Sequence, residues 1–522
     1  MKPIKPANMN VTSKQPFFIA AICFTGVFLL LYPLYQYVFD LDGIGYLMIT
    51  KRLANGDIPD AINGCWSPLQ SWLLVPFYKM GVNEFTAFKF SNGVFSLGIL
   101  WCVYRLMLKT SLTPVLRIAI LWICIPILLA YSFFQLAGDL LLCLLLLIYI
   151  NIASDELLFE KPLKNVLCGV IGGLAYLSKA YALPFFIVHF SLIQFILWKQ
   201  SQVANRNNLL LKNLVAGIGT LLLLAAPWVY ALYGKYHFFT FSYAGRLNMS
   251  WELAPKPVTD AFAIGGPPNA TSPAYWEDPY LPPPYYHAFT SKAAFAKQIK
   301  VLLHNIVEAL QCFHLISFLS LSIVLAGGIW LVKNKDHRFT TWWLMAVILP
   351  SGYLLMHIEP RYIWAVTFLV LIAGTIMLQQ ALSLWKVSKP MWLLCWCIYF
   401  GSFLPYPANL LQDKTNEDRP LFELANTLKQ QQIRGKLACR EENLDVTQKL
   451  AYLTGNQCYL VHMADYTYDQ LGRQLKEAGI PYFFYYYQSP QELELFRQTT
   501  LYGQSPIHLH MADHRLVIVQ VQ

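Results

Sequence analysis

Long apolar runs constrain this chain more than any other feature of its sequence. About eleven runs of roughly 17 or more residues occur, each long enough to cross the core of a bilayer as a helix. They are expected near residues 17–37, 86–108, 115–133, 138–153, 164–178, 182–198, 211–232, 308–332, 341–357, 362–382 and 391–406. Of the 522 residues, 56% are hydrophobic and 13% are charged, whereas soluble domains contain about 25% charged residues. The chain is therefore predicted to be a polytopic α-helical membrane protein.

Positive charge in the short loops predicts how this bundle is oriented. Lys2, Lys5 and Lys14 precede the first apolar run, and later loops on the same side also carry Lys and Arg. Loops rich in these residues stay in the cytoplasm, so the N-terminus is expected there. An odd number of spans then leaves the C-terminal part outside a multi-pass membrane, which the compact loops suggest is a bacterial inner membrane. Because this bias accounts for the net charge of +10, nucleic-acid binding is not expected.

The chain is predicted to divide into a transmembrane domain, residues 1–412, and a soluble extracytoplasmic α/β domain, residues 413–522. In the second part, helices are expected at 419–432, 445–454, 467–478 and 490–497, and strands at 436–440, 457–462, 480–487 and 515–521. This alternation predicts a small, mostly parallel sheet. It carries no recognisable catalytic motif, so we interpret it as a docking or stabilising domain. Cys439 and Cys458 either form a disulfide or remain free thiols.

Two long external loops are expected to interrupt the transmembrane domain. Residues 39–68 include a predicted amphipathic helix from Ile44 to Asn55, and a helix at 69–80 is too short to cross the membrane. Residues 233–307 are rich in Pro, Tyr and Trp, which predicts an irregular loop at the bilayer interface or over a cavity. Its charged residues, among them Glu277 and Asp278, are expected to be mainly solvated. Loops of this length are more often functional lids than spacers.

Two carboxylates follow the first apolar run directly. Asp40 and Asp42 are separated by Leu41, and on an extended segment this spacing points both side chains to one side. A carboxylate at a membrane face is costly and usually functional. It could act as a general base towards an acceptor hydroxyl, or hold a divalent cation beside a phosphate. The alternative is a helix N-cap, for which Asp is a preferred residue.

The sequence after these carboxylates has a recognisable pattern. Asp42-Gly-Ile-Gly-Tyr46 leads through an amphipathic helix to Gly56-Asp57, and Trp66-Ser67-Pro68-Leu69 follows. Over residues 15–410 the chain resembles the GT-C superfamily of membrane glycosyltransferases, in particular its protein mannosyltransferase and aminoarabinose transferase members. The resemblance implies that the acidic residue of the first external loop is catalytic and that the donor is a polyprenyl-phosphate-linked sugar. Because Leu41 separates the two acidic residues here, the resemblance leaves open which one is the base.

Two further charged residues lie at predicted span ends on the outer side. Asp139 opens the fourth span, where capping alone would explain it, and the resemblance implies a role in positioning an acceptor or metal. Lys179 lies between two apolar runs, where its ammonium could pair with the donor phosphate. Its alternative is a lysine that extends to the lipid headgroups.

Glu359-Pro360-Arg361-Tyr362 joins two spans on the outer side. Arg361 suits bidentate recognition of a phosphate, and Tyr362 adds a hydroxyl donor. The alternative is a pair of interfacial anchors. Glu359 and Tyr46 join Asp139 as candidates for positioning the acceptor or a metal.

These residues together predict an inverting glycosyltransferase. It would transfer a sugar from a polyprenyl-phosphate donor, held among the membrane lipids, to a hydroxyl of a glycolipid, polysaccharide or protein acceptor. A divalent cation, Mg²⁺ or Mn²⁺, is a candidate cofactor, with Asp40 and Asp139 as ligands. The alternatives are a membrane transporter of a polar or lipid-linked solute and a non-catalytic scaffold of the same fold. Transport is less favoured because the halves show no internal repeat.

Overall fold

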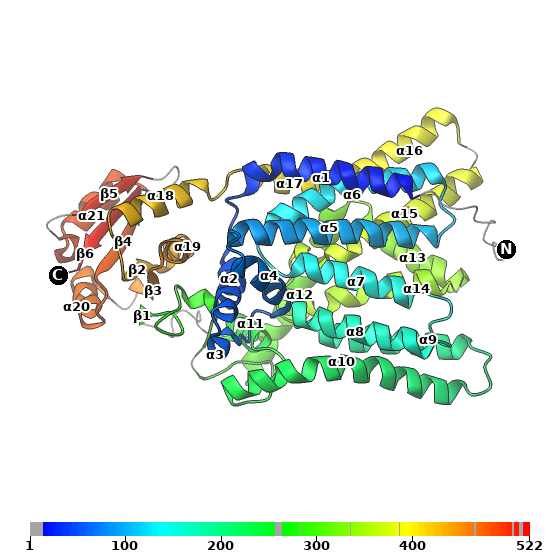
Figure 1. The fold of residues 1–522 in the computed structure, drawn as a ribbon, viewed down its shortest axis with the longest axis horizontal. Helices are drawn as coiled ribbons and strands as arrows, with labels where there is room; N and C mark the ends of the chain where they lie inside the picture. Colours follow the sequence, from blue (N-terminus) through cyan, green and yellow to red (C-terminus); the bar gives the residue numbers. More distant parts are fainter. Residues whose placement is uncertain are drawn as a thin grey trace.

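A bundle of long helices and a small α/β domain form the two parts of the molecule (Figure 1). The computed structural model describes residues 14–255, 264–281, 283–334, 336–385, 387–463, 466–503, 506–510 and 515–521. Lys2 and Lys5, on which the predicted orientation partly depends, lie outside these residues. The helices run side by side, and the α/β domain covers one end of the bundle (Figure 1).

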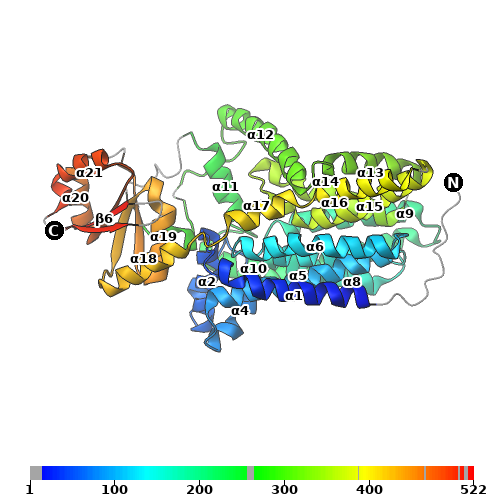
Figure 2. The ribbon, with the colours of Figure 1, turned by 90° about the horizontal axis from the view of Figure 1, so that it is seen from above.

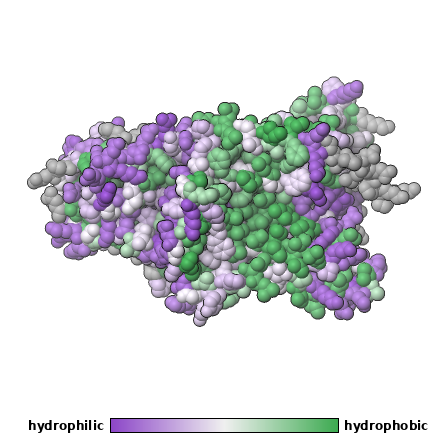
Figure 3. All heavy atoms as spheres, viewed as in Figure 1, coloured by the Kyte–Doolittle hydropathy of each residue, from purple (hydrophilic) through white to green (hydrophobic). Residues whose placement is uncertain are grey.

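Seven helical segments of the described residues are long and apolar enough to cross a membrane. They are α1 (Gln15–Tyr35), α5 (Glu84–Leu108), α6 (Pro114–Phe134), α9 (Ala182–Gln200), α10 (Arg206–Tyr236), α12 (Lys292–Ile316) and Pro360–Trp385, which joins η4 (Pro360–Ile363) to α15 (Trp364–Trp385). Shorter helices complete the bundle: α7 (Asp139–Ala153), α8 (Pro162–Ser178), α13 (Ser320–Asn334), α14 (His337–Ser351) and α16 (Lys389–Gly401). Apolar residues form a broad band over these helices, with hydrophilic residues on either side (Figure 3). The chain is thus a multi-pass membrane protein.

Two predicted spans are divided in the structure. The run at 308–332 is split between α12 and α13, because Ser317 adopts an extended conformation and its hydroxyl accepts the amide of Leu319 at 3.1 Å. Helix α12 also begins earlier than predicted and is inclined to its neighbours (Figure 2). The run at 391–406 is split between α16 and α17 (Pro405–Asp413), where Pro405 starts a new helix. A Ser and a Pro residue therefore divide two apolar runs, each of which hydropathy predicts as one continuous helix.

Short helices lie across the end of the bundle that faces the α/β domain (Figure 1). They are α2 (Leu41–Ala54), α3 (Ile58–Ala61) and α4 (Leu69–Lys79). The short helix expected at 69–80 is confirmed, and the helix expected from Ile44 begins earlier, at Leu41. The long loop between α10 and α12 was expected to be irregular. It instead contains three regular elements: α11 (Ala244–Leu253), β1 (Ile264–Gly265) and η2 (Tyr275–Glu277).

The C-terminal domain is a sheet covered by helices. Its helices are α18 (Arg419–Gln430), α19 (Leu444–Thr454), α20 (Tyr468–Glu477) and α21 (Pro490–Arg497), and its strands are β2 (Lys436–Arg440), β3 (Gln457–Val461), β4 (Tyr482–Tyr487), β5 (Ile507–His510) and β6 (Arg515–Gln520). Within the described residues the strand order is β1-β3-β2-β4-β6-β5. Only the β2–β3 and β2–β4 pairs of this sheet are parallel, so the prediction of a mostly parallel sheet is wrong. The short connection between β5 and β6 permits only antiparallel pairing.

Two cysteines lie on neighbouring strands of this sheet. Cys439 of β2 and Cys458 of β3 are buried free thiols whose sulfur atoms lie 4.0 Å apart. Of the two alternatives left open by the sequence, the structure has the free thiols.

A buried ion pair fastens the long loop to α2. Arg52 donates from Nε to Glu277 Oε1 at 2.7 Å and from Nη2 to Ser272 Oγ at 2.9 Å. The side chains of Arg52 and Glu277 are 4% and 3% exposed. Asp278 is also paired, through Oδ2, with Lys235 at 2.7 Å. The expectation that these loop carboxylates are solvated is therefore wrong, because they meet cations that lie far away in the sequence.

Replacing Glu277 by Ala is expected to lower the free energy of unfolding by about 3 kcal/mol, because it leaves a buried guanidinium without its main partner. Arg52 keeps its weaker contacts to Asp57 and Asp60, so we expect the lower part of the range known for buried pairs. Thermal unfolding of the full chain in detergent measures the loss.

The matched control is Glu494→Ala, which removes the partner of Arg497 in a pair exposed on both sides. An exposed pair contributes about 0.5 kcal/mol, so this variant should unfold almost as the unaltered protein does. Equal losses in the two variants would show that burial of the Arg52–Glu277 pair has no special weight.

Candidate functional site

The candidate site lies where four segments end beside one another at the domain-covered end of the bundle. Asp42 comes from the first turn of α2, Asp139 from the first turn of α7, Lys179 follows the last residue of α8, and Arg361 belongs to η4. The fold thus brings together residues that the sequence places up to 319 positions apart. The structure thus places four of the candidate residues named from the sequence in one cluster.

The guanidinium of Arg361 is the centre of the cluster. Its Nη1 donates to Asp42 Oδ2 at 2.8 Å and lies 3.5 Å from Asp139 Oδ2. Its Nε donates to Glu359 Oε2 at 2.6 Å. The Arg361 side chain is 10% exposed and that of Asp139 is 2% exposed. A cation so deeply buried is stable only because carboxylates surround it.

Lys179 supplies the second cation of the cluster. Its ammonium forms an ion pair with Asp139 Oδ1 and lies 4.1 Å above the centre of the Tyr362 ring. The Tyr362 hydroxyl in turn donates to Glu359 Oε1 at 3.3 Å. Lys179 is therefore part of the polar cluster rather than a lysine that reaches lipid headgroups. Three carboxylates and two cations face one another at this position.

Asp40 and Asp42 have different partners. Asp40 Oδ1 accepts the amide of Leu136 at 2.7 Å, whereas Asp42 contacts Arg361 and accepts the indole N–H of Trp276 at 3.3 Å. The expectation of an extended segment with both carboxylates on one side is wrong, because the helix begins between them at Leu41. Asp40 occupies the N-cap position, although its side chain makes no capping bond within the described residues. Of the pair, Asp42 is the one that faces the cations.

Proton affinities differ across the cluster. Burial, followed by the charge of Asp42, raises the pKa of Asp40 from 3.8 to about 6. Burial alone would raise the pKa of Glu359, but hydrogen bonds and charge from His357 and Arg361 outweigh it and lower that pKa to about 2. The low pKa keeps Glu359 a carboxylate at physiological pH, whereas the raised pKa of Asp40 makes its carboxyl easier to protonate.

Tyr46 belongs to α2 and lies close to Asp139 and Asp42 of the cluster. Burial, followed by the charges of Asp139 and Asp42, raises the pKa of its hydroxyl. Gly138 allows the close approach, since a Cβ at this glycine would lie 2.8 Å from Ser178 O and 3.3 Å from the Tyr46 hydroxyl. Tyr46 is therefore placed to donate a hydrogen bond and stays protonated.

The described residues fit a metal ion poorly. Among them, no group of three or more His, Cys, Asp or Glu side chains could hold one. The carboxylates of Asp42 and Asp139 share the Arg361 guanidinium, which occupies the place between them, and Asp40 binds a backbone amide instead. The Mg²⁺ or Mn²⁺ site expected at Asp40 and Asp139 stays a prediction, and no chemical step is assigned to it.

A cavity of about 510 Å³ adjoins the cluster. It is lined by Glu252 of α11, by Lys297, Lys300, Val301, His304, Asn305 and Glu308 of α12, and by His357. His357 Nε2 lies 3.2 Å from Glu359 Oε1, so the cavity reaches the side chain that pairs with Arg361. A polar ligand in this cavity would lie next to the charged cluster.

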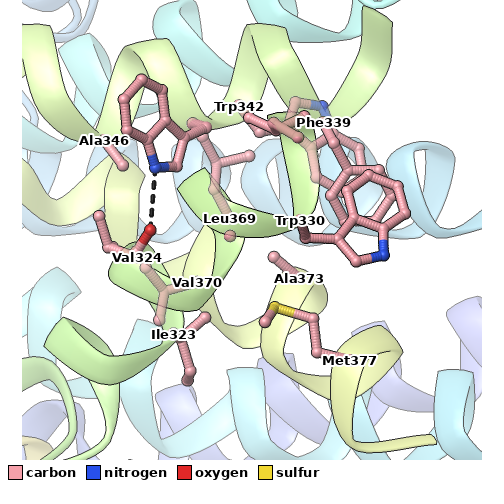
Figure 4. Close-up of a pocket in the computed structure, with 13 residues that line it drawn as sticks. Ile323, Val324, Trp330, Phe339, Trp342, Ala346, Leu369, Val370, Ala373 and Met377 are labelled. Atoms are coloured by element: carbon pink, nitrogen blue, oxygen red, sulfur yellow. Dashed lines mark hydrogen bonds between the residues drawn. The ribbon is translucent and has the colours of Figure 1, made fainter. Parts of the chain in front are cut away.

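A second cavity lies among α13, α14 and α15 and is apolar (Figure 4). Its walls include Trp330, Phe339 and Met377, and the indole of Trp343 donates to Val324 O at 2.9 Å. These walls offer van der Waals contact and, among the described residues, no acid or base. The charged groups described above therefore lie outside this second cavity.

Two residues near the site were missed by the sequence analysis. Trp276 donates to Asp42 but lies in a loop whose aromatic residues gave no sign of which one reaches the site. Lys89 of α5 is fully buried, and its ammonium has no hydrogen-bond partner among the described residues. A lysine inside an apolar run is a signal that the sequence did offer, since such charges are usually functional or paired.

The fold of this chain, a bundle of membrane helices with a soluble domain at one end, is similar to that of solved glycosyltransferase structures. No protein-family model matches the sequence, and no curated protein matches it either. The likeness is therefore one of structure.

Particular solved structures share this fold. ArnT from Cupriavidus metallidurans in the apo state is 13% identical, with a TM-score of 0.54 over 97% of this chain and 98% of that chain. ArnT bound to undecaprenyl phosphate is also 13% identical, with a TM-score of 0.53 over 98% and 99% of the two chains. The oligosaccharyltransferase of Archaeoglobus fulgidus in the apo form is 11% identical, with a TM-score of 0.52 over 90% of this chain and 69% of that chain.

Replacing Asp40 by Asn is expected to raise the melting temperature by a few degrees above about pH 7. The pKa of Asp40 is about 6 in the folded protein and 3.8 as its ordinary value, so the folded state binds the proton more tightly. The stabilisation that this gives is fully present below about pH 4. This contribution is lost as the pH rises through about 6, where the ionised carboxylate becomes a cost. The amide avoids that cost, so its advantage should shrink steadily between pH 7 and pH 4. Differential scanning fluorimetry in detergent across this range measures it.

The exposed Asp413 provides the control, because Asp413→Asn removes a carboxylate from a solvated position. Its melting temperature should follow that of the unaltered protein at each pH. A lower melting temperature for Asp40→Asn at neutral pH would mean that the Asp40 charge stabilises the fold.

Proposed function

We propose that this protein transfers a sugar from a polyprenyl-phosphate donor to a hydroxyl of an acceptor at the outer face of the membrane. The observation that carries the proposal is the contact between Asp42 Oδ2 and Arg361 Nη1 at 2.8 Å. It puts a candidate base next to a candidate phosphate ligand. An acceptor proton and a departing phosphate can then be handled in one site. The GT-C fold supports the same reaction class.

In this proposal Lys179 and Arg361 bind the donor phosphate, and the Tyr362 hydroxyl adds a hydrogen bond. Arg is suited to phosphate because its guanidinium presents a planar fork of donors. Both cations are paired with carboxylates, so an arriving phosphate would compete for them. That competition loosens the hold of Arg361 on Asp42. The undecaprenyl phosphate bound in the ArnT structure of the same fold supports a lipid-phosphate donor.

The reaction proceeds by a single displacement. The acceptor oxygen attacks the anomeric carbon from the face opposite the phosphate, and Asp42 takes the hydroxyl proton. The bond from carbon to phosphate oxygen breaks, and its electron pair leaves with the polyprenyl phosphate. Lys179 and Arg361 stabilise the negative charge that develops on that oxygen. One displacement inverts the configuration at the carbon.

The acceptor enters by the cavity along α12. Its polar lining reaches Glu359 through His357, so Glu359 can orient the acceptor beside Asp42. In this proposal Asp139 and Tyr46 help to position the reacting groups. A glycolipid, a polysaccharide or a protein could present the hydroxyl.

The charge of the loops and the position of the site support the proposed orientation. The basic loops favour a cytoplasmic N-terminus, and the candidate site and the α/β domain lie at the same end of the bundle (Figure 1). Both would then face the periplasm of a bacterial inner membrane. The prenyl chain of the donor would lie against the apolar outside of the helices, which lets the enzyme meet a substrate that does not leave the bilayer.

Asp42→Asn is expected to reduce sugar transfer by at least about 100-fold, because a general base contributes about that much or more. Cells that lack this chain are complemented with the unaltered protein or the variant, and their envelope glycolipids and glycoproteins are compared by mass spectrometry. Asp413→Asn serves as the control, since it removes an exposed carboxylate of the same kind.

The alternatives give different outcomes at equal membrane levels of the protein. A change in solute uptake without loss of any glycan would favour a transporter. Normal glycans and normal uptake would favour a scaffold without catalysis. Either outcome overturns the proposed transfer reaction.

A further inference from the structure

The C-terminal domain reaches the candidate base through one tryptophan. Helix α19 of this domain packs against α2, and Gln448 Oε1 accepts the backbone amide of Trp276 at 3.0 Å. The indole Nε1 of the same Trp276 donates to Asp42 Oδ1 at 3.3 Å. A continuous path of two hydrogen bonds thus joins the soluble domain to the carboxylate.

We propose that the C-terminal domain positions Asp42 for catalysis, with Gln448 acting through Trp276. Gln448 does not touch the substrates and is a positioning residue. The inference rests on the proposed function, in which Asp42 is the base. It assigns to the soluble domain a role in the reaction beyond docking or stabilising the chain.

Trp276 is held from two sides. On the bundle side, Trp66 Nε1 donates to Trp276 O at 3.1 Å. Gly45 makes room for Trp66, since a Cβ at this glycine would lie 2.1 Å from the Trp66 ring. On the domain side, Gln448 holds the amide of the same residue. These two hydrogen bonds hold the Trp276 backbone from which the indole projects towards Asp42.

Neighbouring contacts bind the same loop to the domain. The amide of Cys458 donates to Pro273 O at 2.8 Å, and Gln457 Nε2 donates to Ala270 O at 2.9 Å. Strand β1 pairs with β3, which places Ile264 opposite Val461. The loop is therefore bonded to the C-terminal domain as well as, through Glu277 and Arg52, to α2 of the bundle.

Helix α19 is itself fixed to the bundle near the candidate site. The Tyr452 hydroxyl donates to Glu84 Oε1 at 2.8 Å, and Lys51 pairs with the same oxygen at 2.9 Å. Asp418 accepts the amide of Phe39 at 2.8 Å, and Lys449 pairs with Asp418 at 2.9 Å. These contacts lie just before the first turn of α2, at Phe39, and in its last turn, at Lys51, so α19 is bonded near both ends of the helix that carries Asp42.

The path matters most when the donor is bound. Asp42 Oδ2 is held by Arg361 and Oδ1 by Trp276. Once a phosphate draws the guanidinium away, the indole is the contact that still orients the carboxylate. A rigid indole then keeps the base aimed at the acceptor during the displacement.

The test compares Gln448→Met, which keeps the length of the side chain and removes the acceptor oxygen, with Gln448→Glu, which restores an acceptor. Thr447→Val is the matched control on the same helix, because the Thr447 hydroxyl contacts Tyr486 at 3.0 Å inside the domain. Hydrogen–deuterium exchange on the full chain in detergent follows the Trp276 amide. Steady-state transfer with the donor and acceptor identified by the glycan comparison follows kcat and KM.

Gln448→Met should speed exchange of the Trp276 amide and lower kcat about three- to tenfold, with the donor KM unchanged within about twofold. Gln448→Glu should recover most of the rate, and Thr447→Val should leave both the exchange and the rate unaltered. Normal kcat in Gln448→Met, while Asp42→Asn is inactive, would overturn the positioning role and leave the proposed reaction standing. If Asp42→Asn retains full transfer, the proposed function fails instead, whatever the exchange of Trp276 shows.

Discussion

The burial of the Arg361 guanidinium is the constraint on which the site depends. A cation with little access to water is tolerated only where carboxylates compensate it, and Asp42, Asp139 and Glu359 do so. Two of these come from the first turns of different helices, α2 and α7. The ends of those helices must therefore meet beside η4. The same requirement that stabilises the fold brings the proposed base, Asp42, and the proposed phosphate ligand, Arg361, to one place.

Much of the architecture could be predicted because its causes are local. Apolar runs gave most of the helices, and the alternation of patterns after residue 413 gave most of the elements of the α/β domain with nearly correct ends. The prediction was wrong where a single side chain or a partner far along the chain determines the local structure. Ser317 interrupts an apolar run by bonding to its own backbone neighbour. Strand β1 pairs with a segment far along the chain, which no local pattern signals.

The residues of the candidate site could be predicted from the sequence, but their arrangement in space could be predicted only in part. Asp42, Asp139, Lys179 and Arg361 could be named because charged residues at the ends of apolar runs stand out. Their mutual pairing could not, because it depends on tertiary contacts. Because α2 begins at Leu41, Asp40 lies before the helix and Asp42 lies in its first turn, and the two carboxylates have different partners. The sequence did not show at which residue the helix begins. Trp276 was indistinguishable from the other aromatic residues of its loop.

The pairing of β1 with β3 has a consequence for how the molecule is made. Ile264 leaves the ribosome long before Val461, the residue that it faces in the finished sheet. Contacts between such distant positions form late, after the chain that supplies both partners exists. The loop between α10 and α12 therefore lacks its partner strand until the chain has been synthesised as far as β3. A nascent or truncated chain that ends before β3 would contain the bundle helices without this strand pairing.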